Sequence, residues 1–147
     1  MSKVRLVADT NVVILAFLWG GKPRHIIDLG IDQLLTLVTS EALLNELADV
    51  LSRHKHESRL MQIGISVEDL LTSYRRFCEM APQTEIHPTV LKDSDDDTVL
   101  ACALGGGADY IVTGDAHLLN LKRYHAIPIL TISEFLALLE SPNATTL

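Results

Sequence analysis

Short apolar runs rich in β-branched residues alternate along the chain with longer amphipathic segments. Each run is bounded by residues that break strands, and the runs are residues 4–8, 34–39, 110–113 and 128–131. Runs of this kind are typical of strands that are buried on both faces of a parallel sheet. The pattern therefore predicts four buried strands.

The segments between these runs have the spacing of helices. Ser40, Ser66, Ser94 and Ser133 are predicted N-caps, and Gly20 follows the first helix. The alternation predicts an α/β domain with a mostly parallel sheet of four or five strands and helices on both faces. The predicted helices cover residues 11–19, 23–29, 41–53, 67–80, 94–105, 116–121 and 134–139, with one further helix allowed before residue 66.

Length and composition fit one domain, which we predict to span residues 1–140, with a flexible tail at 141–147. Apolar residues make up 48% of the 147 residues and charged residues 21%, as in ordinary soluble proteins. No apolar run approaches the roughly 18 residues of a membrane helix, and the first residues do not resemble a signal peptide. We therefore expect a cytoplasmic protein without a membrane partner.

The net charge of −7 argues against a broad surface that coats nucleic acid. It does not exclude a nuclease, because clustered carboxylates can hold metal ions, which then supply the positive charge that meets phosphate.

Two acidic residues, Asp9 and Asp115, directly follow predicted strands. In parallel sheets, ligands bind beyond the carboxyl ends of the strands, so both acids are candidates for one site. A helix N-cap is the alternative role for each of them. Thr10, Asn11 and Thr113 add short polar groups that could orient these carboxylates.

Two further acids are candidates on helices. Glu46 lies at the border of an apolar helix face, where it can lean into a cleft or remain a solvated surface residue. The run from Asp93 to Asp97 holds more acids than helix capping needs. Spacing alone does not decide whether Asp96 or Asp97 faces the site. Such oxygen ligands suit Mg²⁺ or Mn²⁺, which can lower the pKa of bound water.

Five segments together resemble the PIN-domain family, and more narrowly the VapC-like ribonuclease toxins of bacterial toxin–antitoxin pairs. They are residues 7–13, 20–23, 39–51, 95–101 and 108–119. The resemblance implies a three-layer α/β/α fold and a metal-dependent endoribonuclease that uses Mg²⁺ or Mn²⁺. It also implies an RNA substrate, a small antitoxin protein as a partner, and a homodimer.

By motif position, the resemblance carries the family's acidic site, both metal-binding and catalytic, onto Asp9, Glu46, Asp97 and Asp115. The family spacing of an Asp followed by Leu-Ala selects Asp97, and it leaves Asp96 as an accessory candidate beside the supporting residues Asn11 and Thr113. One departure is Asp93-Ser94, where relatives often have Asp-Pro.

Other polar residues near these acids have ordinary interpretations. The basic residues around Lys55 are interpreted as a solvated helix surface, with contact to the RNA backbone as the alternative, and His117 as an incidental neighbour of Asp115. The alternative function is a non-catalytic PIN-like module that binds RNA or protein. The complete set of four acids argues against this alternative, because a binding module has no need of converging carboxylates.

Overall fold

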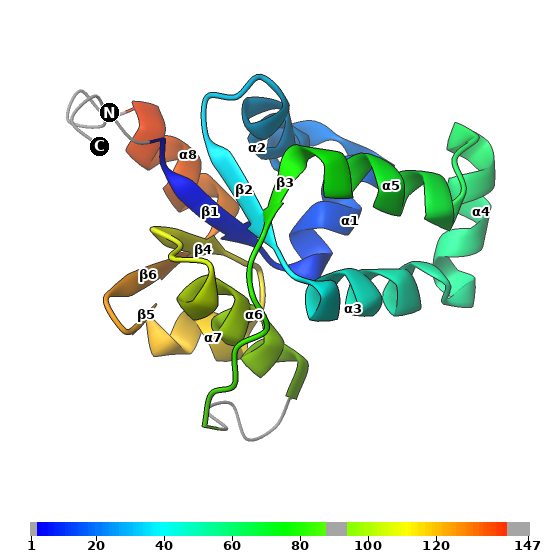
Figure 1. Cartoon of the computed structure of the whole chain (residues 1–147). Coiled ribbons are helices and arrows are strands. Elements are labelled where there is room, and N and C mark those ends of the chain that lie inside the picture. Colours follow the sequence, from blue (N-terminus) through cyan, green and yellow to red (C-terminus); the bar gives the residue numbers. More distant parts are fainter. Residues whose placement is uncertain (1–2, 88–93, 141–147) are drawn as a thin grey trace.

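The computed structural model describes residues 3–87 and 94–140 (Figure 1). The predicted tail at 141–147 and Asp93 lie outside these described residues. None of the helices within the two described ranges is long and apolar enough to cross a membrane.

One mostly parallel sheet organises the fold. Its strands are β1 (Arg5–Ala8), β2 (Thr36–Thr39), β3 (Cys78–Met80), β4 (Tyr110–Val112), β5 (Arg123–Tyr124) and β6 (Ile127–Leu130). They lie in the order β3-β2-β1-β4-β6-β5, and every pairing is parallel except that of β5 with β6. The predicted α/β fold with a mostly parallel sheet is confirmed.

Across the described residues the sheet has six strands rather than the four or five predicted. The helix predicted for 67–80 ends at Phe77, and the prediction was wrong for its last turn. Cys78–Met80 instead pairs with β2, and the Ala81 N–H donates to the Thr39 carbonyl at 2.8 Å. The open edge of β2 offers these partners, and a local helical pattern does not reveal them.

Eight helices occur in the described residues, close to the predicted positions. The predicted caps at Ser40 and Ser66 accept hydrogen bonds from Leu43 N and Asp69 N. The last helix is capped by Thr131 rather than Ser133, because Thr131 and Glu134 exchange side-chain and backbone hydrogen bonds. The helices are α1 (Thr10–Trp19), α2 (Gly21–Ile31), α3 (Glu41–Leu51), α4 (His54–Ile63), α5 (Val67–Phe77), α6 (Ser94–Gly105), α7 (Ala116–Leu121) and α8 (Ile132–Glu140).

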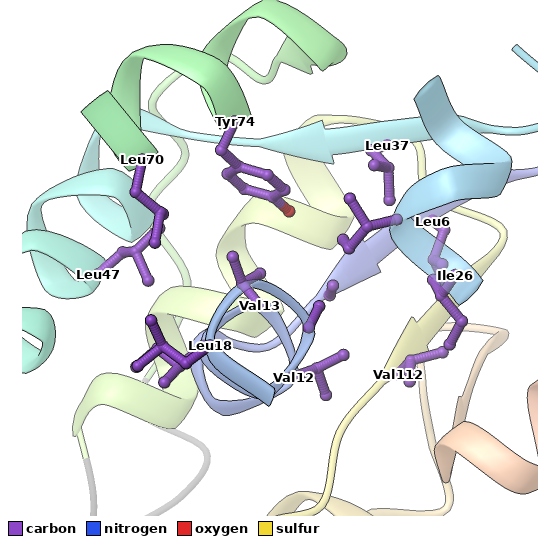
Figure 2. Close-up of a cluster of buried hydrophobic side chains, with 14 of the residues drawn as sticks. Leu6, Val12, Val13, Leu18, Ile26, Leu37, Leu47, Leu70, Tyr74 and Val112 are labelled. Atoms are coloured by element: carbon purple, nitrogen blue, oxygen red, sulfur yellow. The ribbon is translucent and has the colours of Figure 1, made fainter. Parts of the chain in front are cut away.

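Helices pack on both faces of the sheet, as predicted. Successive residues of β1 point to opposite faces, so Leu6 joins the cluster with α1, α2, α5 and α8, while Val7 joins the cluster with α6 and α7. Figure 2 shows the first cluster, in which the fully buried ring of Tyr74 and the side chain of Leu37 lie on the same side of the sheet. These two apolar layers hold the carboxyl ends of the central strands in place.

Candidate metal centre

The sheet order creates a crevice beside β1. From β1 the chain leads through α1 and α2 to β2 on one side, whereas β4 lies on the other side. This is the type of position at which parallel α/β sheets bind ligands. Ala8 is in register with Val112, and the Asp9 N–H donates to the Val112 carbonyl at 3.0 Å. The ends of β1 and β4 therefore bring Asp9 close to Thr113.

Asp9 is 6% exposed, and neighbouring groups fix both of its carboxylate oxygens. Oδ1 accepts a hydrogen bond from Thr10 N at 2.7 Å, which caps α1. Oδ2 accepts one from the fully buried hydroxyl of Thr113, also at 2.7 Å. A carboxylate has about four acceptor positions, so these two bonds do not by themselves prevent it from binding a cation. Capping and ligand binding are thus compatible roles for Asp9.

Glu46 reaches the same crevice from α3. Its Oε2 accepts a hydrogen bond from Thr10 Oγ1 at 2.9 Å, and its side chain is half-buried. The sequence could not establish the partner of Glu46, because Thr10 lies 36 residues earlier in the chain. This contact joins the start of α1 to α3.

Asp115 follows β4 and caps α7. Its N–H donates to Thr113 Oγ1 at 3.0 Å, and its Oδ1 accepts from His117 N at 2.7 Å. Thr113 therefore accepts from the backbone of Asp115 and donates to Asp9, which fixes the direction of its hydroxyl proton. One chain of hydrogen bonds connects three of the predicted acids.

The structure separates the two candidates on α6. Asp96 is 4% exposed and lines a pocket of about 210 Å³ together with Asp9, Glu46 and Asp115. Asp97 is less buried and lines a different pocket, of about 480 Å³, which is also bordered by Asn45 on α3. The structure thus brings Asp9, Glu46 and Asp115 together with Asp96 and leaves Asp97 outside that group.

Among the described residues, one group has metal-ligand spacing and includes a histidine. One ligand atom from each of Asp96, Asp115 and His117 lies within 4.8 Å of the other two. The interpretation of His117 as incidental does not account for this spacing. Its position two residues after Asp115 was the available signal, because His117 lies in the first turn of α7.

The pocket is strongly acidic, and its rim carries cations. Four carboxylates line it, two of them almost fully buried, and the exposed residues Arg53 and Lys55 also line it. Burying several carboxylates together is unfavourable unless a cation compensates their charge. Oxygen donors of this kind suit a hard divalent cation, so the residues present fit the metal that the resemblance implied.

The two predicted supporting residues differ in their positions. Thr113 is buried and bonded to Asp9, whereas Asn11 is exposed and lies at the pocket lining. Thr10, at 5% exposure, contacts both Asp9 and Glu46. The residue that connects two acids is thus Thr10 rather than Asn11.

We expect Thr113→Val to lower the free energy of unfolding by about 2 kcal/mol in metal-free buffer at neutral pH, because a buried charge-assisted hydrogen bond is lost. Thr113→Ser is the matched control, since it keeps the hydroxyl and loses only a methyl group. Urea unfolding of both variants tests this. Equal stability of the Val and Ser variants would contradict a role for the hydroxyl.

The chain is similar to known proteins in sequence pattern and in fold. A family model described as PIN domain matches residues 5–117. A search of curated protein sequences found no match. A chain in the crystal structure of VapBC2 from Rickettsia felis, bound to a DNA fragment from their promoter, is similar with a TM-score of 0.57 and 15% identity over 87% of this chain and 98% of that chain. The T. brucei RRP44 PIN domain gives a TM-score of 0.49 and 13% identity over 99% of this chain and 86% of that chain.

Proposed function

The chain belongs to the PIN domain family, and we propose that it is a divalent-metal-dependent endoribonuclease. PIN domains are generally nucleases, so a nuclease-type role follows from membership. We propose RNA as the substrate, a requirement for a metal, and cleavage at internal phosphodiester bonds. The observation that carries the proposal is the pocket at the sheet edge, which four carboxylates from different elements line.

We propose Asp9, Glu46, Asp96 and Asp115 as the residues that hold the metal, which is Mg²⁺ or Mn²⁺. Asp96 takes the place that the sequence motif gave to Asp97, because Asp96 lines the pocket. A bound divalent cation would neutralise a phosphodiester oxygen and make a water nucleophilic at neutral pH.

The chain's own residues orient this site and meet the substrate. The hydroxyl groups of Thr113 and Thr10 donate hydrogen bonds of 2.7 and 2.9 Å to Asp9 and Glu46, so these carboxylates are pre-positioned. Arg53 and Lys55 line the same pocket and are exposed, so they can contact the flanking phosphates of an RNA strand. These two cations therefore allow a protein with a negative net charge to bind RNA at the pocket.

We propose further that the protein is the toxin of a toxin–antitoxin pair, with a small antitoxin as its partner. The similarity in fold to a chain of VapBC2 supports this idea. A homodimer and a cytoplasmic location, both expected from the sequence, stay predictions. Light scattering that gives the monomer mass at every concentration would rule out the homodimer.

The purified protein is expected to cleave a structured RNA internally with Mg²⁺ or Mn²⁺ and to stop when a chelator is added. Asp9→Asn, prepared in the same way, is the control for a contaminating nuclease. Cleavage by wild type alone supports the proposal. Equal cleavage by both proteins, or RNA binding without cleavage under every metal condition, would contradict it, and the second result would favour a non-catalytic module.

A further inference from the structure

We propose that His117 is a nitrogen ligand of the bound metal and makes the site bind Mn²⁺ more tightly than Mg²⁺. The inference rests on the proposed function, because it concerns the metal that this function requires. The imidazole of His117 adds a nitrogen ligand to the four carboxylates. The carboxylates alone fit both Mg²⁺ and Mn²⁺, whereas the nitrogen ligand favours Mn²⁺.

The position of the imidazole supports a ligand role. His117 Nδ1 lies 3.7 Å from Asp115 Oδ1, which is too long for a hydrogen bond. Two ligands on one octahedral cation with bonds of about 2.1 Å lie about 3.0 Å apart when adjacent and about 4.2 Å apart when opposite. The observed separation falls between these values. A small rotation of the imidazole would therefore bring the two atoms to the spacing of adjacent ligands on one ion.

Backbone contacts hold His117 at this place. Its N–H donates to Asp115 Oδ1 at 2.7 Å, so the start of α7 ties the histidine to the acid beside it. Asp96, on α6, supplies the third ligand atom. Its side chain is 4% exposed, and its Oδ2 atom is buried. α6, α7 and the cap residue Asp115 that precedes α7 thus supply the ligand atoms that lie within 4.8 Å of one another.

The exposure of the ring fits an entry route for the ion. The His117 side chain is 50% exposed and that of Asp115 is 22% exposed, whereas Asp9 and Asp96 are almost fully buried. These four side chains therefore extend from the interior of the protein to its surface. A hydrated cation that enters from solvent would meet the histidine and Asp115 first.

Ligand chemistry connects the histidine with the choice of metal. Mg²⁺ takes oxygen ligands almost exclusively and gives up its waters reluctantly. Transition-metal dications accept imidazole nitrogen, and their affinity for such mixed sites increases from Mn²⁺ onward. A site of carboxylates with one imidazole should therefore favour Mn²⁺ over Mg²⁺.

Pulsed EPR of the Mn²⁺-loaded full chain tests the inference directly, because a coordinated imidazole nitrogen couples magnetically to the manganese. We expect this coupling in wild type and its loss in His117→Gln, which keeps a polar side chain of similar length. Calorimetry should give a Mn²⁺ affinity about tenfold lower for His117→Gln, with Mg²⁺ affinity changed by less than about threefold. His25→Gln, at an exposed position on α2, is the matched control.

The outcomes separate this inference from the proposed function. Coupling in wild type and His25→Gln but not in His117→Gln supports the nitrogen ligand. Tight Mn²⁺ binding by wild type without nitrogen coupling, or coupling that persists in His117→Gln, overturns the inference and leaves the proposed function standing. A wild-type protein that binds neither cation overturns both.

Discussion

Asp96→Asn is expected to lower the rate of RNA cleavage by about 1000-fold, whereas Asp97→Asn is expected to change it by less than about threefold. The two residues are adjacent, and both substitutions remove one negative charge without changing side-chain size. Only Asp96 lines the pocket with Asp9, Glu46 and Asp115. Asp97 lines a separate pocket between α3, α6 and residues 81–84.

Single-turnover cleavage of one RNA at saturating Mn²⁺ is the appropriate measurement, because it reports the chemical step rather than product release. Each variant serves as the control for the other, since both remove one negative charge from the same helix. A large loss in Asp97→Asn with a small one in Asp96→Asn would restore the motif-based assignment. Equal large losses would mean that the charge of the whole α6 N-terminus matters rather than one ligand.

For the pair Asp96 and Asp97, the sequence motif and helical geometry favour different residues. Adjacent residues on a helix point about 100° apart, so the rotation of α6 decides which acid faces the sheet. Val99 and Leu100 are fully buried, and Asp96 precedes them by three and four residues, on the same face. The buried face of the helix was therefore a usable signal, although the family spacing selected the neighbouring residue.

The strands and the acids that follow them were predictable because their signals are local. A short β-branched run identifies β1 or β4 without knowledge of its neighbours, and Asp9 and Asp115 come directly after these strands. The edge strand β3 was not predictable in this way, because Cys78–Met80 depends on pairing with β2. Contacts between residues far apart in the sequence were not predictable for the same reason, because they depend on how the chain folds.

The contact between Thr10 and Glu46 is one of these distant contacts. Thr10 directly follows Asp9, and the sequence indicated only that a short polar group stood there. Its hydroxyl bonds to Glu46 because the start of α1 and the middle of α3 approach each other in the folded chain. This approach depends on packing over the sheet, so a hydrogen-bond network of this kind appears only with the structure.

The pocket itself should oppose folding until a metal binds. We expect saturating Mn²⁺, at about 100 times the dissociation constant, to raise the free energy of unfolding by about 2.7 kcal/mol. For a chain of this size, that gain corresponds to an increase in Tm of about 10 °C. Thermal unfolding with and without a chelator measures it, and an unchanged Tm would contradict metal binding at this site.

Asp96→Asn should change stability in two opposite directions, which a purely structural acid would not do. In metal-free buffer the variant should be more stable than wild type by about 1 kcal/mol, because one of several clustered negative charges is removed. With Mn²⁺ it should lose most of the metal-dependent gain, while Asp97→Asn keeps that gain. If Asp96 served the fold alone, its substitution would lower stability in both buffers. The sign of the change without metal therefore tests whether these carboxylates converge for a ligand rather than for packing.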